Sequence, residues 1–136
     1  MDNKKLSIRP ALNLSSTIPI EDFQNRTLRP ILKLQHSFIL QMAAFFCSKQ
    51  KVALSNIKEK EYEKVIAGIL KKNIPSRNQL IGGIVGHFTV SEFLFYEKHD
   101  TEINKRILAM IEKKIRENQL AIKKIKQTNH DNSTKN

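Results

Sequence analysis

The sequence predicts an all-α fold, a bundle of four or five helices in which the first and last helices are long. Apolar residues recur at steps of three or four along most of the chain, which is helical spacing. Only four glycines and four prolines occur in 136 residues, whereas turn-rich β folds use more of both. This length suits one core and is too short for two domains. We expect the long first and last helices to be antiparallel, with a glycine-containing helix between them.

The two ends of the chain lack this periodicity. Residues 1–18 mix Asn, Ser and Lys with isolated aliphatic residues, which predicts an extended or flexible N-terminal arm that could still lie against the domain. Residues 127–136 are almost entirely polar and predict a disordered tail. The helical domain is therefore expected over residues 19–126.

The first helix is expected to begin at Pro19. Proline suits a first helical turn, and the acids Glu21 and Asp22 follow where the helix dipole is positive. Pro30 either kinks one long helix or separates a short helix from a longer one. The predicted inward stripe comprises Phe23, Thr27, Ile31, Leu34, Phe38, Met42 and Phe45.

A second helix is expected to open at Ser55 and to end at Asn73 and Pro75. Ser76 is then expected to cap a third helix. The inward residues of the second helix are predicted to be Ile57, Tyr62, Val65, Ile66, Ile69 and Leu70, and those of the third Leu80, Ile84 and Phe88.

Two signatures place a helix start at Thr89. Thr89 and Glu92 have the spacing of a capping box, and Phe88 and Phe93 have that of a hydrophobic staple. The final helix is expected to begin near residues 100–101 and to run to about residue 126. Its inward residues are predicted to be Ile103, Ile107, Met110, Ile111, Ile115, Ile122 and Ile125.

Three of the four glycines lie close together in the stretch LIGGIVGHFTVSEF, residues 80–93. The spacing does not fit a Walker loop, since no lysine follows, and no strand precedes the glycines as a dinucleotide loop requires. Gly82 and Gly86 are four residues apart and share one helix face, which predicts a helix-packing contact. A flexible hinge and an anion-binding loop are the alternatives.

No constellation of catalytic or metal-ligating residues is recognisable. The histidines, residues 36, 87, 99 and 130, have no ligand spacing, and His87 is expected to be a hydrogen-bonded structural residue. Cys47 is the only cysteine; it fits a reducing compartment and is expected to be a small buried apolar side chain. We therefore expect a protein that is not an enzyme and needs no cofactor or metal.

The chain is strongly basic, with Lys+Arg 24 against Asp+Glu 13, a net charge of +11 and a pI near 9.9. Such a charge favours an anionic partner. On a continuous last helix, six basic residues fall within an arc of roughly 100° opposite the isoleucine stripe. They are Lys105, Arg106, Lys113, Arg116, Lys123 and Lys124.

These six residues predict either a polyanion-binding face or a solvated face. The pairs Glu102–Arg106 and Glu112–Arg116 dilute the positive charge. Arg26, Arg29 and Lys33 of the first helix would extend the patch if the first and last helices packed together.

The function expected is non-enzymatic binding of a polyanion, RNA or the ribosome in preference to duplex DNA, although no zinc finger, known RNA-binding signature or clear helix-turn-helix is recognisable. A helical protein-interaction adaptor or homodimer is the alternative. The longest uncharged stretches span 15 and 14 residues, shorter than the roughly 20 that cross a membrane. With no apolar run of signal-peptide length near the N-terminus, we expect a soluble, cytoplasmic protein.

Three segments together resemble a group of small, mostly uncharacterised helical proteins of Bacteroidota bacteria, some of which carry the label glyoxalase. The segments are FQNRTLRPILKLQHSFIL, IGGIVGHFTVSEFLFY and INKRILAMIEKKI, and the resemblance covers roughly residues 20–120. It implies a helical fold. Metal-dependent glyoxalases use βαβββ modules with His and Glu ligands on strands, and neither is recognisable in this sequence. The lysine-rich C-terminus also departs from the group.

Overall fold

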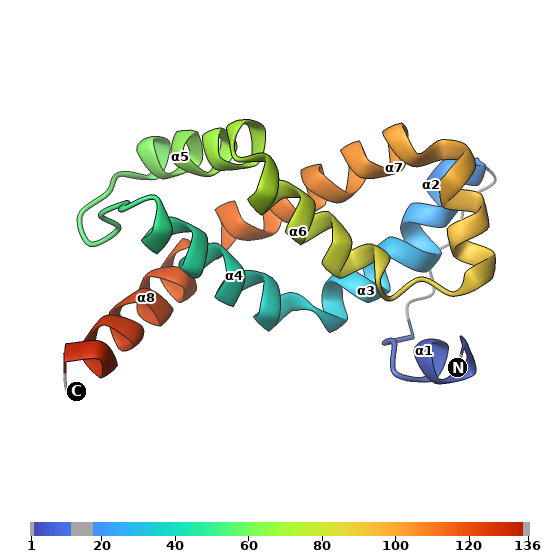
Figure 1. The fold of residues 1–136 in the computed structure, drawn as a ribbon, viewed down its shortest axis with the longest axis horizontal. Helices are drawn as coiled ribbons and strands as arrows, with labels where there is room; N and C mark the ends of the chain where they lie inside the picture. Colours follow the sequence, from blue (N-terminus) through green and yellow to red (C-terminus); the bar gives the residue numbers. More distant parts are fainter. Residues whose placement is uncertain (1, 12–17, 135–136) are drawn as a thin grey trace.

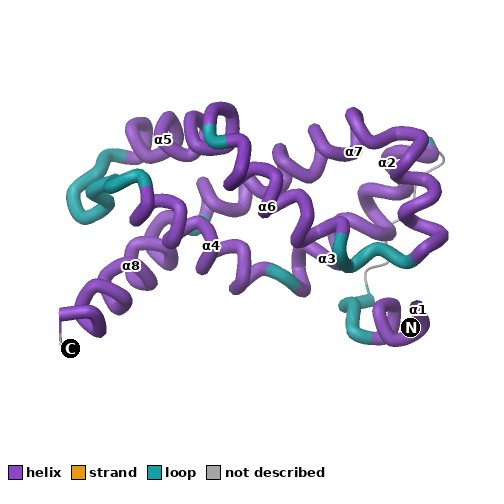
Figure 2. Tube along the Cα trace, viewed as in Figure 1, coloured by secondary structure: helices purple, strands orange, loops and turns teal. Residues whose placement is uncertain are grey.

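A computed structural model of the chain describes residues 2–11 and 18–134, with side chains described as far as residue 126. Every regular element in these ranges is helical, which confirms the predicted all-α class (Figure 2). The elements are α1 (Asp2–Ser7), α2 (Pro19–Phe23), the π-helical η1 (Gln24–Leu28), α3 (Arg29–Leu34), α4 (His36–Lys49), α5 (Glu59–Lys72), α6 (Ile74–Val85), α7 (Val90–Glu117) and α8 (Gln119–Thr134).

These described elements outnumber the four or five predicted helices because single residues interrupt the long ones and because α1 lies in the predicted N-terminal arm. Gln35 (φ −91°, ψ 9°) separates α3 from α4, and Asn118 (φ −119°, ψ 34°) separates α7 from α8. Neither residue is a glycine or a proline, so neither interruption has a sequence signal. The helix does continue through Pro30, because the turn before it widens into η1, and a wide turn tolerates the missing proline N–H.

The chain crosses the molecule three times (Figure 1). Helices α2 to α4 run in one direction, α5 and α6 return, and α7 and α8 run as α2 to α4 do. Hydrogen bonds between the first and the last pass confirm this register. Gln24 is bonded to Arg106, His36 to Lys114, and Val52 to Lys126, so residue numbers rise together along the two passes. The first and last long helices are therefore parallel, and the predicted antiparallel arrangement is wrong because α5 and α6 together form the return path.

The isoleucine stripe of the last pass forms the centre of the core, as predicted. Ile103, Ile107, Ile111 and Ile115 of α7 and Ile122 of α8 are at most 2% exposed. They pack with residues of the other two passes, among them Leu28, Ile31, Tyr62, Leu80 and Ile84. The Tyr62 hydroxyl donates to the carbonyl oxygen of Ile115 at 2.7 Å, so its one polar group is satisfied inside the core.

The predicted stripe of the first pass is correct only as far as Ile31, since Leu34, before the break at Gln35, is already 38% exposed. Ile31 is fully buried, but Phe38 and Phe45 are 58% and 52% exposed. The non-helical ψ at Gln35 turns α4 about its axis. As a result, α4 buries a neighbouring face instead, made of Ile39, Leu40, Ala43, Ala44, Phe46 and Cys47.

The predicted helix start is correct at Thr89 and wrong at the starts of α5 and α6. Thr89 caps α7 in a complete capping box with Glu92, as expected. Helix α5 begins at Glu59 rather than at Ser55. Asn73, not Ser76, caps α6: its side-chain oxygen accepts a bond of 3.1 Å from the Ser76 N–H.

The end of the chain also differs from its prediction. The break predicted before residue 100 is a kink at His99 (φ −137°) inside α7. The backbone of α8 is helical to Thr134, beyond the expected end near residue 126.

The described part of the N-terminal segment lies against the junction of α6 and α7. The Lys5 ammonium donates to the carbonyl oxygen of Phe88 at 2.9 Å, and Asp2 accepts from the Val90 N–H at 3.3 Å. Arg9 reaches the same junction and is bonded to Glu92. These residues were predicted to belong to a flexible arm; the remainder of that arm, residues 12–17, lies outside the described residues, as do residues 135–136 of the predicted tail.

The predicted helix-packing role of Gly82 and Gly86 is wrong. Both glycines are exposed, and a Cβ built at Gly82 would meet no atom within 4 Å. A Cβ at Gly86 would meet the carbonyl oxygen of Gly82 at 3.2 Å, which belongs to the preceding turn and not to a neighbouring helix. Helix α6 instead packs through Leu80 and Ile84, on its other face.

Candidate functional site

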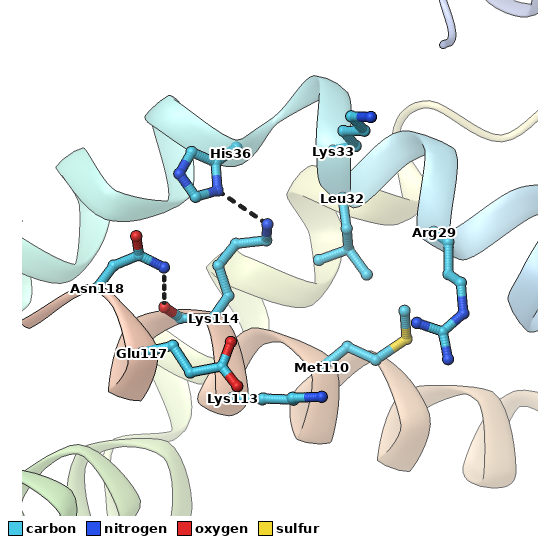
Figure 3. Close-up of a pocket in the computed structure, with 9 residues that line it drawn as sticks. All are labelled: Arg29, Leu32, Lys33, His36, Met110, Lys113, Lys114, Glu117 and Asn118. Atoms are coloured by element: carbon cyan, nitrogen blue, oxygen red, sulfur yellow. Dashed lines mark hydrogen bonds between the residues drawn. The ribbon is translucent and has the colours of Figure 1, made fainter. Parts of the chain in front are cut away.

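A groove opens between the first and last passes, bounded on one side by α3 and the start of α4 and on the other by the second half of α7 (Figure 3). Its volume is about 520 Å³. We call it the α3–α7 groove. The residues that line it are Arg29, Leu32, Lys33, His36, Met110, Lys113, Lys114, Glu117 and Asn118.

Helical spacing explains which side chains reach the groove. Arg29 and Lys33 are four residues apart, so they lie on one face of α3, while Leu32 beside them is 3% exposed and belongs to the core. Lys113 and Lys114 face them from α7. Four cations therefore line the groove against one carboxylate, that of Glu117. Such an excess of positive charge in a concave surface attracts anions.

His36 and Lys114 meet across the groove from α4 and α7 (Figure 3). The Lys114 Nζ lies 2.9 Å from the His36 Nδ1. Asn118 donates to the Lys114 carbonyl oxygen at 2.7 Å and so satisfies a backbone acceptor in the last turn of α7.

The pKa values of both residues are lowered. Burial lowers the pKa of His36, and the charge of Lys114 lowers it further. Burial also lowers the pKa of Lys114, which the charge of Glu117 opposes. Both pKa shifts favour the less positively charged forms, and burial is the larger cause in each residue.

The six basic residues predicted from the sequence do not form one continuous face. Because α7 ends at Glu117 and α8 leaves in another direction, Lys123 and Lys124 are separated from the other four (Figure 1). Of the six, only Lys113 lines the α3–α7 groove. Lys105 is exposed elsewhere on α7.

The two arginines of the predicted face have other neighbours. Arg106 is directed to Glu102 at 3.2 Å and to the side chain of Gln24 at 2.8 Å. Arg116 lines a separate depression that also contains Glu59 and Glu63 of α5. Glu102 and Gln24 therefore partly offset the charge of Arg106, and Arg116 lies in a depression that also holds carboxylates.

The predicted contribution of the first helix depended on packing against the last helix, and that packing is present. Arg29 and Lys33 lie in the groove. Arg26 does not: it pairs with Asp22 at 2.7 Å and is 63% exposed. His36 and Lys114 were missed as site residues, because only the parallel register of α4 and α7 brings them together.

Other candidate residues are in structural positions. His87 is hydrogen-bonded to Gln35, as a structural histidine was expected to be. Cys47 is fully buried, as expected. Within the described residues, no group of three or more His, Cys, Asp and Glu side chains could hold a metal ion. In the same ranges, no helix has both the length and the apolar character needed to cross a membrane.

Comparisons with known proteins find no match: no family model matches the chain, and neither does any curated protein or solved structure. The resemblance to the Bacteroidota proteins therefore stays a prediction. What the α3–α7 groove can bind follows from its own residues.

Proposed function

We propose that this protein binds RNA, free or within the ribosome, through the α3–α7 groove. The observation that carries the proposal is that four cations from two helices line one open groove: Arg29, Lys33, Lys113 and Lys114. Phosphate contacts from lysine and arginine supply most of the affinity of nucleic-acid complexes. The net charge of +11 adds long-range attraction toward the same ligand.

The position of these cations favours a single strand or loop over duplex DNA. A protein that reads duplex DNA commonly inserts a protruding helix into the major groove and contacts base edges there. Here the cations line a depression between two helices, with Leu32 and Met110 among its lining residues. A depression admits a strand whose phosphates are turned toward the protein. We therefore propose RNA and expect weaker binding of duplex DNA.

The test is a pair of triple variants that remove the same charge. The groove variant carries Arg29→Gln, Lys33→Gln and Lys113→Gln. Its matched control carries Lys60→Gln, Lys64→Gln and Lys71→Gln, at exposed positions of α5. Affinity for a single-stranded RNA of about 20 nucleotides, and for a duplex DNA of equal length, is measured by fluorescence anisotropy over a range of salt concentrations.

We expect the groove variant to bind RNA more weakly and to show a flatter salt dependence. Each lost phosphate contact lowers the slope of log affinity against log salt by roughly 0.7 for a single strand. The α5 variant should keep the wild-type slope. An equal loss in both variants would mean that net charge alone attracts the RNA. Binding by the wild type no tighter than that of an unrelated protein of similar pI would exclude the proposed function.

A second candidate function, homodimer formation, is favoured by the outward face of α4. Phe38 and Phe45 are 58% and 52% exposed, seven residues apart, and line a depression with Met42. Residues 34–48 contain no Lys, Arg, Asp or Glu, so the like charge at this face is limited to its end, where the Lys49 ammonium lies 5.3 Å from the centroid of the Phe45 ring. In a two-fold pair of antiparallel α4 helices, Phe38 of each copy would face Phe45 of the other.

Analytical ultracentrifugation tests the dimer. We expect a concentration-dependent dimer in the wild type, and a monomer with an unchanged helical circular-dichroism spectrum for Phe45→Glu. A wild-type protein that stays monomeric at about 100 μM would exclude this function.

A further inference from the structure

The contact between Lys114 and His36 requires a neutral imidazole. An ammonium group has three donors and no acceptor, so the Lys114 Nζ donates and the His36 Nδ1, 2.9 Å away, must accept. In the described part of the chain, this ring nitrogen is the one acceptor that the Lys114 ammonium has. Two of its N–H donors remain for a ligand in the groove.

We propose that His36 and Lys114 form a seat for one phosphate of the RNA backbone, and that this seat takes up a proton when the phosphate enters. This inference rests on the proposed function, since RNA is the source of the phosphate. A phosphate oxygen between the two side chains can accept from the Lys114 Nζ. It can accept from the His36 Nδ1 as well only if that nitrogen carries a proton. A neutral imidazole could supply this donor by moving its proton from Nε2 to Nδ1, but the negative charge of the phosphodiester favours the imidazolium over either neutral tautomer. Seating the phosphate therefore exchanges the Lys114–His36 bond for two charge-assisted bonds, and the ring takes one proton from the solvent.

The charged groups around the seat disfavour the state in which both His36 and Lys114 are cationic when no anion is bound. A bound anion makes this state favourable. From α3, Arg29 and Lys33 face the groove; from α7, Lys113 and Glu117 do so. No charged residue of α4 lines it, His36 being the only titratable group there. With Lys114, the lining therefore holds four cations against one carboxylate before His36 is protonated. A phosphodiester brings a negative charge to the point where the extra positive charge would form.

The direction of the linkage follows from which state holds more protons. In the free protein, burial and the charge of Lys114 lower the pKa of His36, so the imidazole is neutral at pH 7. A seated phosphate opposes the effect of Lys114 and raises the pKa of His36. The bound state then holds more protons than the free state, and lower pH favours it. RNA affinity should rise as the pH falls from 8 to 6, by at most tenfold per pH unit for one linked proton.

Isothermal titration calorimetry measures this proton uptake directly. The ligand is a single-stranded RNA with hydroxyl groups at both ends, because a terminal phosphate has its own pKa near 6. Titrations at pH 6.5 in two buffers of different ionisation enthalpy give the number of protons taken up per RNA bound. We expect a fraction of one proton for the wild type and none for His36→Gln, whose amide can still donate to a phosphate. His99→Gln, at the kink in α7 and not among the groove residues, is the matched control and should keep the wild-type uptake.

The outcomes separate this inference from the function on which it rests. RNA binding without proton uptake, or uptake that persists in His36→Gln, would overturn the phosphate seat and leave RNA binding intact. A wild type that binds no RNA would overturn the proposed function and the seat with it. Uptake that is lost in His36→Gln and kept in His99→Gln supports both.

Discussion

Arg9 and Glu92 form a bidentate ion pair that connects the N-terminal segment to the first turn of α7. Arg9 Nη1 lies 2.8 Å from Glu92 Oε2, and Arg9 Nη2 lies 2.8 Å from Oε1. The same carboxylate accepts from the backbone N–H of Thr89 at 2.8 Å and from the hydroxyl of Thr27 at 2.7 Å. One side chain thus joins the N-terminal segment, η1 and the start of α7, three parts of the chain that are far apart in sequence.

We expect Arg9→Ala to lower the free energy of unfolding by about 2–4 kcal/mol, measured by urea denaturation. The side chains of Arg9 and Glu92 are only 6% and 16% exposed, so the substitution leaves a largely buried carboxylate without its cation. The matched control is Arg26→Ala, whose ion pair with Asp22 is formed by an arginine that is 63% exposed. That loss should be below about 1 kcal/mol. Equal losses in the two variants would show that the Arg9–Glu92 pair stabilises the fold no more than an exposed ion pair does.

The ion pair also predicts an acid-sensitive fold. Burial raises the pKa of Glu92, but the hydrogen bonds from Arg9, Thr89 and Thr27 outweigh it, and the pKa is lowered from its ordinary value of 4.5. Because the folded-state pKa lies below the unfolded one, the stabilisation is complete above pH 4.5 and is lost as the pH falls through the folded value.

Chemical denaturation between pH 3 and pH 7 should therefore show a steeper loss of stability below pH 4.5 in the wild type than in Glu92→Gln. The glutamine variant lacks the titrating group and should start from a lower stability at pH 7. Parallel pH profiles would contradict this assignment.

The cap of α7 makes a prediction that is separate from the ion pair. The Thr89 hydroxyl accepts from the backbone N–H of Glu92 at 3.1 Å, and Thr89 is 6% exposed. Thr89→Ala should cost about 1 kcal/mol of unfolding free energy, whereas Thr89→Ser keeps the hydroxyl and should recover most of it. If alanine and serine were equally destabilising, the threonine methyl group and not its hydroxyl would be the important part.

Two features set by neighbours in sequence were predicted correctly. The capping box at Thr89 and the isoleucine stripe of α7 depend on spacings of three or four residues, which the sequence displays directly. Features set by distant parts of the chain were not. Arg9 and Glu92 are 83 residues apart, and nothing in the local pattern around either residue indicates the other.

The candidate site shows the same limit. Arg29, Lys33 and Lys113 were identified as basic residues of two helices that could pack together. The pairing of His36 with Lys114 requires the parallel register, which depends on how α5 and α6 return the chain. The exposed faces of Phe38 and Phe45 depend on the break at Gln35, which is formed by an ordinary helix-compatible residue.

The exposed glycines of α6 predict a stabilising substitution. Gly82→Ala should raise the free energy of unfolding by about 0.5–1 kcal/mol, because alanine has the higher helix propensity and its Cβ meets no atom within 4 Å. Gly68→Ala in α5, equally unobstructed, should behave alike. Gly86→Ala should gain less, since its Cβ lies 3.2 Å from the Gly82 carbonyl oxygen. A loss of stability in Gly82→Ala would revive a close contact or a hinge at this position.

The last prediction concerns the single thiol of the chain. Cys47 is fully buried in α4, and burial raises the pKa of its thiol more than the nearby charge of Lys126 lowers it. The burial of the thiol and its raised pKa both slow alkylation, because the reactive species is the exposed thiolate. In native buffer at pH 8, iodoacetamide should modify Cys47 at least about 100-fold more slowly than in urea, since reaction requires transient opening of the fold. Ser48→Cys adds a thiol at an exposed neighbouring position, and this second thiol should react at an ordinary rate under the same conditions. If Cys47 reacts only when the whole protein unfolds, Arg9→Ala should speed its modification. The factor should correspond to the loss of unfolding free energy in that variant. Rapid modification of Cys47 in the native wild type would mean that α4 opens easily, and would place the least stable part of the fold at the C-terminal end of this helix.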